Sequence, residues 1–141
     1  MGKQGRKKAG WAIHCCANHF CGAYGDNGIE FLPYLCNAHT HGMERFGHPD
    51  FQVVLRYSDK EIMRILNTFG LWVLKGRRFH DGELVPGVIE GGNVQLREFE
   101  ESGRKVLRVI IPDCYNRFPE EALCTKPFCQ QLLETRDLVK K

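Results

Sequence analysis

The sequence predicts a single α+β domain, with a mainly antiparallel sheet and one principal helix packed on it. Three observations predict this class. The chain has 141 residues, the usual size of one domain, and 43% of them are apolar, enough for one core. Its β-rich segments are separated by turns at hairpin rather than crossover spacing. One segment has a clear helical pattern of apolar residues.

Each predicted strand is rich in apolar, aromatic or β-branched residues and is bounded by turn formers. The last two strands are joined by the turn Glu101-Ser102-Gly103-Arg104, which predicts an antiparallel hairpin. Pro112 ends the second of them. The predicted strands cover residues 11–16, 31–42, 51–57, 93–99 and 105–111.

The principal helix is predicted to follow Ser58, which has the capping-box spacing to Glu61. Apolar residues recur at helical spacing from 62 to 73 and define one face. Gly76 is a plausible stop, and Gly70 is expected to bend or end the helix. A short second helix is predicted around residues 127–137.

The net charge is +3, but four of the 20 basic residues lie in the first ten positions, and the rest of the chain carries −1. Residues 1–9 are therefore expected to form a flexible basic tail, and residues 10–141 the domain. No apolar run approaches the roughly 20 residues of a membrane span, and no secretion signal is evident. Seven cysteines without such a signal favour reduced thiols and a cytoplasmic protein. We expect no membrane partner and no nucleic-acid partner beyond the tail.

The most unusual chemical feature is the histidine-dense stretch at residues 39–48. Alternate side chains of a strand share a face, so Asn37, His39 and His41 are expected to project together. Two such imidazoles can reach one metal ion or one substrate, and Asn37 is a candidate ligand-binding residue.

A third group must come from beyond the strand, and His48, Asp50 and Glu44 are the candidates. With His48, the two strand histidines would provide the three protein ligands of a catalytic divalent metal such as zinc. Alternatively, neutral imidazoles can exchange protons without a metal, with His39 and His41 as catalytic groups. The histidines could also simply hydrogen-bond their neighbours.

A polar loop follows the hairpin, where binding groups often gather. Asp113 could orient a histidine or act as a catalytic base, and Arg117 could bind a phosphate or carboxylate. The alternative is that Asp113 and Arg117 pair with each other and hold the loop.

A second cluster, at residues 14–21, contains soft metal ligands. Cys16 and Cys21 are at the edge of zinc-finger spacing, and Cys124 and Cys129 would have to complete a structural site. Buried free thiols are the alternative.

Three blocks of the chain resemble the bacterial domain-of-unknown-function family numbered 4262. They are GWAI at 10–13, AHTHGMERFGHPDF at 38–51 and PDCYNRFP at 112–119. Many members resemble this chain but have an aromatic and an aliphatic residue in place of His39 and His41, so it looks like a histidine-bearing branch. Members also tend to begin with a helix before the first block, whereas a short basic tail precedes it in this sequence. The resemblance implies an intracellular bacterial or phage-encoded protein and no particular activity.

The leading functional hypothesis is a small-molecule or metal site on the sheet, with acid–base or metal-assisted hydrolysis of a polar or phosphorylated metabolite. A non-catalytic module that sequesters a ligand or binds a protein is the alternative. The sequence contains no Walker phosphate loop, dinucleotide-binding fingerprint or nucleophile elbow. Whether the protein is an enzyme, and its oligomeric state, stay open.

Overall fold

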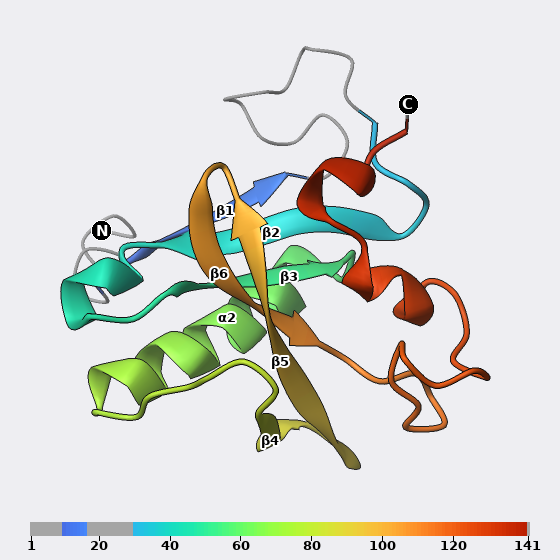
Figure 1. Ribbon diagram of the computed structural model, residues 1–141. Helices are drawn as coiled ribbons and strands as arrows, with labels where there is room; N and C mark the ends of the chain where they lie inside the picture. Colours follow the sequence, from blue (N-terminus) through green and yellow to red (C-terminus); the bar gives the residue numbers. More distant parts are fainter. Residues whose placement is uncertain (1–9, 17–29, 141) are drawn as a thin grey trace.

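The computed structural model describes residues 10–16 and 30–140. The described residues form one mixed sheet of six strands with a single α-helix on one face, which confirms the predicted α+β class (Figure 1). The order of the strands across the sheet is β1-β2-β3-β6-β5-β4. The strands are β1 (Ala12–Cys16), β2 (Leu35–His41), β3 (Asp50–Leu55), β4 (Leu84–Ile89), β5 (Gly92–Glu101) and β6 (Arg104–Ile110).

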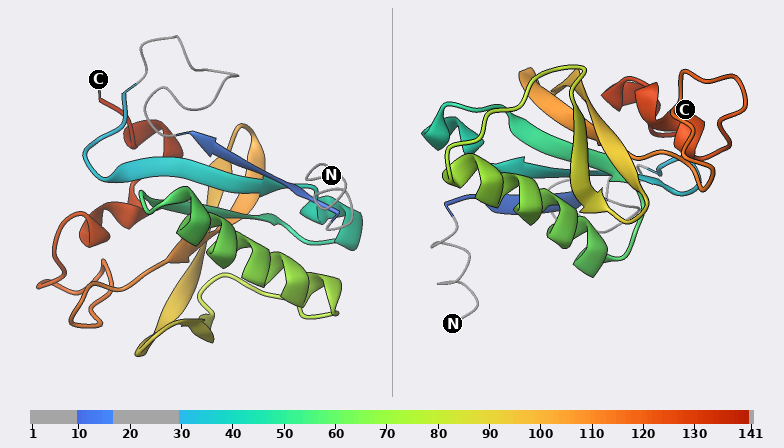
Figure 2. Two further views of the ribbon diagram at one scale, coloured as in Figure 1. Left: turned by 180° about the vertical axis from the view of Figure 1, so that it is seen from behind. Right: turned by 90° about the horizontal axis from the view of Figure 1, so that it is seen from below.

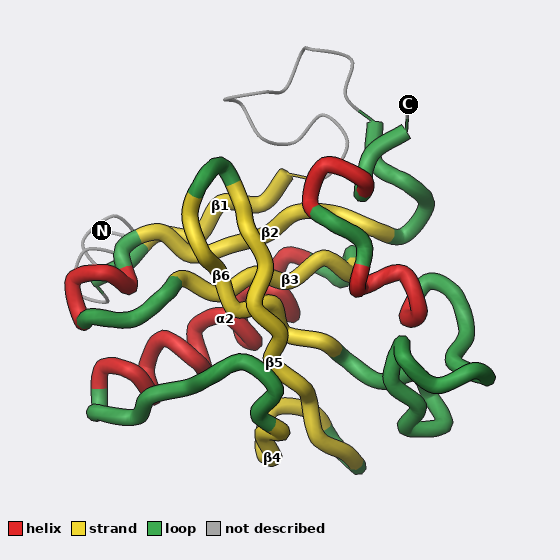
Figure 3. The backbone as a smooth tube through the Cα atoms, in the orientation of Figure 1, coloured by secondary structure: helices red, strands yellow, loops and turns green. Residues whose placement is uncertain are grey.

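All neighbouring strands are antiparallel except the central pair, β3 and β6. The pair is parallel because the chain leaves β3 through the helix and returns by way of the β5–β6 hairpin. Beyond the strands the described chain contains three short 3-10 helices, drawn with the helix in red in Figure 3. They are η1 (Met43–Phe46), η2 (Phe128–Leu132) and η3 (Thr135–Asp137).

The helix α2 (Asp59–Leu74) begins as its sequence predicts, because the Ser58 hydroxyl accepts a hydrogen bond from the Glu61 backbone N–H at 3.2 Å. Its buried face packs across one side of the sheet, where the rings of Phe51 on β3 and Phe69 on α2 stack at 4.9 Å. Figure 2 shows this layer from behind and from below.

The helix does not end at Gly70, since α2 continues to Leu74. The Trp11 ring accounts for glycine at position 70, because a Cβ at this position would lie 2.4 Å from the ring. The Trp11 indole also donates a hydrogen bond to Asn67 at 2.9 Å. Gly70 therefore creates the space that lets the chain before β1 pack on the helix.

The other side of the sheet carries buried polar side chains of β2, β3 and β6, and the segment holding η2 and η3 lies on that side (Figure 2). Arg108 of β6 holds the segment in place. Its guanidinium is fully buried and donates to the carbonyls of Gln131 and Leu133 and to the Thr135 hydroxyl. It also lies 3.5 Å from the centroid of the Phe99 ring. Burial lowers the pKa of Arg108 to about 9, so the group stays charged at neutral pH.

Two local expectations differ from the structure. The predicted helix at 127–137 is instead η2 and η3, separated by an extended Leu133. Residues 84–89, where no strand is predicted, form β4, which contains Pro86. A proline is tolerated there because β4 is the edge of the sheet and needs no donor on its free side. The predicted tail at 1–9 lies outside the described residues. Within the described ranges, no helix combines the length and hydropathy of a membrane span.

Candidate functional site

Three histidines lie together at one end of the sheet, on β1 and β2. His14 on β1 is directly opposite His39 on β2 in the antiparallel register, and His41 follows two residues after His39 on the same side. The ring centroids are 4.5 Å apart for His14 and His41, 4.7 Å for His39 and His41, and 5.6 Å for His14 and His39. The prediction that His39 and His41 project together is therefore confirmed, and His14 joins them. We call these three residues the histidine cluster.

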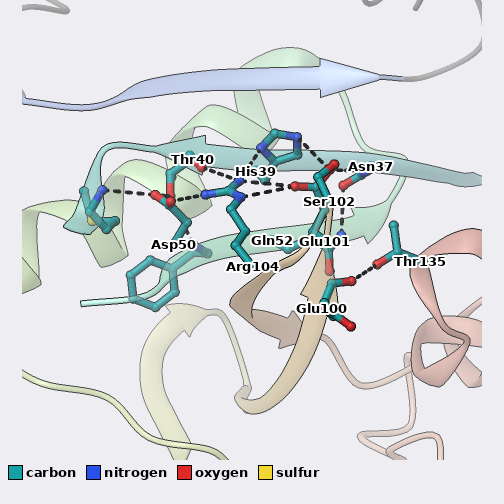
Figure 4. A network of polar contacts seen from close by, with 12 residues as sticks. Asn37, His39, Thr40, Asp50, Gln52, Glu100, Glu101, Ser102, Arg104 and Thr135 are labelled. Carbon is teal, nitrogen blue, oxygen red and sulfur yellow. Dashed lines mark hydrogen bonds and ion pairs between the residues drawn. The ribbon is translucent and has the colours of Figure 1, made fainter. Parts of the chain in front are cut away.

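His39 is the buried member of the cluster, only 2% exposed, whereas His14 and His41 are exposed. The Arg104 guanidinium lies 3.1 Å from His39 Nδ1 (Figure 4). A guanidinium can only donate, so Nδ1 is the acceptor and the proton of the neutral ring is on Nε2. This Nε2 is buried without a hydrogen-bond partner, and its nearest carboxylate, Glu101, is 3.5 Å away.

Arg104 is oriented by two carboxylates. It forms ion pairs with Asp50 and Glu101, and it donates to the Thr40 carbonyl at 3.2 Å. Glu101 and Arg104 face each other across the β5–β6 turn, in which Ser102 and Gly103 both have positive φ. This is the backbone of a tight two-residue hairpin, so the turn predicted from the sequence is what places the pair beside His39.

A chain of hydrogen bonds runs from this pair across the polar side of the sheet. Asn37 donates to Glu101 at 3.4 Å and accepts from the Gln52 amide at 2.9 Å. Gln52 in turn accepts from Arg108 at 2.7 Å. The chain links the histidine cluster to Arg108 and fixes the side chains beneath the cluster.

The surroundings keep the imidazoles neutral. Burial, reinforced by the positive charge of Arg104, lowers the pKa of His39 to about 4, although Glu101 opposes the shift. Burial and Arg104 also lower the pKa of His41. Burial alone would raise the pKa of Glu101, but His39, Ser102 and Arg104 together lower it. Two carboxylates, of Asp50 and Glu101, and one guanidinium, of Arg104, therefore lie beside the neutral His39 and His41 rings.

Of the other predicted site residues, Asn37 and Asp50 belong to this network, but His48 does not. Its Nε2 accepts from the Phe79 backbone N–H at 3.0 Å, and its ring stacks on Phe51 at 5.1 Å, on the helix side of the sheet. Burial lowers the pKa of His48. The η1 turn, which ends at Gly47 with a φ of 71°, carries His48 away from His39.

The predicted loop residues Asp113 and Arg117 pair with each other, with Arg117 Nε 3.0 Å from the carboxylate. Asp113 also accepts from the backbone N–H groups of Tyr115, Arg117 and Thr125. Burial would raise the pKa of Asp113, but these hydrogen bonds hold it well below its usual range. The two residues follow β6 at the end opposite Arg104, so the loop is not brought to the histidine cluster.

Among residues 10–16 and 30–140, no group of three or more His, Cys, Asp or Glu is arranged to hold a metal ion. Cys21, proposed with Cys16 for a structural metal, lies outside the described residues. Cys124 and Cys129 are free thiols. Burial raises the pKa of Cys124, so its thiol is less readily ionised than an ordinary cysteine.

Sequence reasoning missed His14, Glu101 and Arg104 as members of the site. His14 was assigned to the neighbouring cysteines, and the other two to a turn. The signal that could have found the pair is the hairpin itself, since opposite charges that flank a two-residue turn face each other. No known family model, curated protein or solved structure matches the chain, so the resemblance to family 4262 stays a prediction.

Proposed function

We propose that the histidine cluster binds a small polar molecule that carries a hydroxyl group, and that His41 exchanges a proton with it. The observation that carries this proposal is the buried Nε2 of His39, which has no hydrogen-bond partner. A buried donor without an acceptor is costly, and native proteins rarely leave one unless a ligand or water satisfies it.

The two polar atoms at this point define the chemistry of the ligand. His39 Nε2 can only donate, and the Glu101 carboxylate, 3.5 Å away, can only accept. A hydroxyl group does both, so one such group satisfies the two side chains at once. Because Asp50 and Glu101 outnumber Arg104 in charge, the site favours a neutral or cationic molecule over a phosphorylated one.

The roles of the three rings differ. Arg104 engages Nδ1 of His39, so only Nε2 is left for the ligand, and His39 is a binding residue. His14 covers it, with a nearly parallel ring at an interplanar angle of 14°, and is exposed enough to move aside. His41 is exposed and has a lowered pKa, so at neutral pH it offers a free base for general acid–base chemistry.

Proton NMR of the histidine rings at neutral pH tests the proposal, with glycerol, ethanolamine and inorganic phosphate as probes. Glycerol or ethanolamine is expected to shift the His14 and His41 resonances, and phosphate is not. Glu101→Gln should weaken binding because it adds a donor where an acceptor is needed. His80→Ala, at an exposed position outside the cluster, is the matched control.

A response to phosphate alone, or equal binding by the Glu101→Gln variant, would contradict the proposal. Native mass spectrometry of the purified protein complements the test, because it reports any ligand or metal that is retained. Turnover of a retained ligand would then separate an enzyme from a module that only sequesters.

A further inference from the structure

Four basic side chains lie at one end of the molecule, where α2 ends close to the η1 turn. They are Arg45 of η1 and, just after α2, Lys75, Arg77 and Arg78, and all four are exposed. The Arg78 guanidinium donates to the Phe46 carbonyl at 2.9 Å and so joins the two segments. Both views of Figure 2 show η1 and the last turn of α2 at the same end. We call these four residues the basic end.

Little negative charge opposes the basic end. Among residues 10–16 and 30–140, none of its four cations forms an ion pair with a carboxylate. Residues 43–48 and 75–80 contain these four cations and one acidic residue, Glu44, which leaves a net charge of +3. The next acidic side chain along the chain, Asp81, lies 3.8 Å from Arg97 and pairs with it.

The sequence before β1 joins the fold at the same end. A Cβ at Gly10 would lie 2.9 Å from the Phe46 ring, and the Trp11 and Phe46 rings meet edge to face with centroids 6.4 Å apart. Residues 1–9, which precede Gly10, contain four lysine or arginine residues and no acidic residue. The sequence that is joined to the basic end therefore adds only positive charge.

Two exposed leucines lie beside these cations. Leu71 and Leu74 are three residues apart on α2 and share a side of the helix, and Lys75 follows Leu71 by four residues on that side. Leu71 is 46% exposed and Leu74 is 48% exposed. Large apolar side chains are thus in contact with water directly beside positive charge.

This combination suits a membrane surface better than a nucleic acid. A phosphate backbone attracts the cations alone, whereas a lipid interface attracts cations to its phosphates and buries apolar side chains among its acyl chains. Unpaired bases stack on free aromatic rings, but the Arg77 guanidinium already lies over the rings of Trp72 at 4.6 Å and Phe79 at 4.7 Å. A protein that lies on a membrane needs no spanning segment, so the lack of such a segment in the sequence does not argue against a membrane partner.

We propose that the basic end docks on a membrane surface that contains anionic lipids. Leu71 and Leu74 insert among the acyl chains, and the cations of the basic end face the lipid phosphates. This surface contains none of the three histidines and goes beyond the function proposed for them.

Co-sedimentation of the full chain with lipid vesicles tests the proposal. Phosphatidylcholine vesicles with about 30% phosphatidylserine are the probe, and vesicles of phosphatidylcholine alone are the comparison. Arg45→Gln/Lys75→Gln removes two charges from the basic end. Lys126→Gln/Arg136→Gln is the matched control, because these two cations are also exposed but lie in the segment that holds η2 and η3.

Leu74→Gln tests the apolar contact, and Leu123→Gln, at a position that is 72% exposed in the loop after β6, is its control. Thermal melts check that each variant folds like the parent. Fluorescence anisotropy with a labelled DNA duplex tests a nucleic acid as the partner.

We expect the parent to sediment with the anionic vesicles and not with the neutral ones. Each cation near an anionic surface changes the binding constant by about fivefold, so Arg45→Gln/Lys75→Gln should bind at least about tenfold more weakly. Leu74→Gln should bind about fivefold more weakly, because half of a leucine side chain no longer enters the lipid. Both control variants should stay close to the parent.

Three results would overturn the proposal. One is failure to sediment with the anionic vesicles, whether or not the DNA duplex binds. Another is equal binding by Arg45→Gln/Lys75→Gln. The third is equal binding by Leu74→Gln, which would mean that charge alone, including that of residues 1–9, attracts the protein to the lipid.

Discussion

Lowering the pH is expected to destabilise the protein through His39. In the folded state its Nδ1 accepts a hydrogen bond from Arg104. A proton added to Nδ1 would turn this acceptor into a donor that faces the N–H donor of Arg104. The unfolded chain has no such restriction, and its histidines titrate near pH 6.5. Below that pH the unfolded state binds more protons than the folded state, and stability falls with the pH.

The size of the effect follows from the pKa of His39, which is lowered to about 4. One pKa unit corresponds to about 1.4 kcal/mol, so the full difference between pH 6.5 and 4 is about 3 kcal/mol. About 2 kcal/mol of it should be lost by pH 5, before most carboxylates are protonated. This free energy needs no reduction for screening by solvent, because the His39 side chain is only 3% exposed.

Urea denaturation of the parent and of His39→Gln at several pH values between about 7 and 5 measures this effect. Glutamine can accept from Arg104 and donate towards Glu101, but it does not titrate. The parent should lose about 2 kcal/mol more than the variant over this interval. His80→Gln, whose side chain is 80% exposed, should follow the parent. Parallel curves for the parent and His39→Gln would refute the assignment.

Three further substitutions test the fold. Arg108→Met should lower the free energy of unfolding by about 3 kcal/mol in urea, because several buried acceptors lose their donor, whereas the partly exposed Arg97→Met should change it by less than about 0.5 kcal/mol. Gly70→Ala should destabilise by about 1–3 kcal/mol because of the Trp11 ring, and should instead stabilise in a Trp11→Ala background, as thermal melts of the four proteins would show. Asp113→Asn should speed proteolytic cleavage of the loop that follows β6, and an unchanged cleavage rate would mean that its hydrogen bonds do not hold the loop.

The features that depend on neighbouring residues could be predicted from the sequence. The helix start follows from the Ser58 and Glu61 spacing, and the hairpin turn from Ser102-Gly103. These features depend on neighbours within a few residues, where capping and turn preferences act. The shared direction of His39 and His41 was readable for the same reason, since a strand alternates its sides at every residue.

The contacts between residues far apart in the chain could not be predicted from the sequence. That His14 lies opposite His39 depends on the register between two strands that are far apart in sequence, and a shift by one residue would turn it to the other side. His48 shows the converse. It follows His41 closely, yet the η1 turn sends it to the helix side, where Phe51 and Phe79 surround it. Proximity in sequence therefore wrongly favoured His48 as a member of the site and gave no indication of His14.

The way Arg108 is satisfied has a practical consequence for mapping this protein by deletion. Among residues 10–16 and 30–140, its guanidinium donates to no acidic side chain and relies on Gln52 and on acceptors that the last turns of the chain supply. Deleting residues 131–140 would leave the buried positive charge of Arg108 without most of its hydrogen-bond acceptors. A truncated protein that lost binding would then report misfolding, and not the position of the ligand.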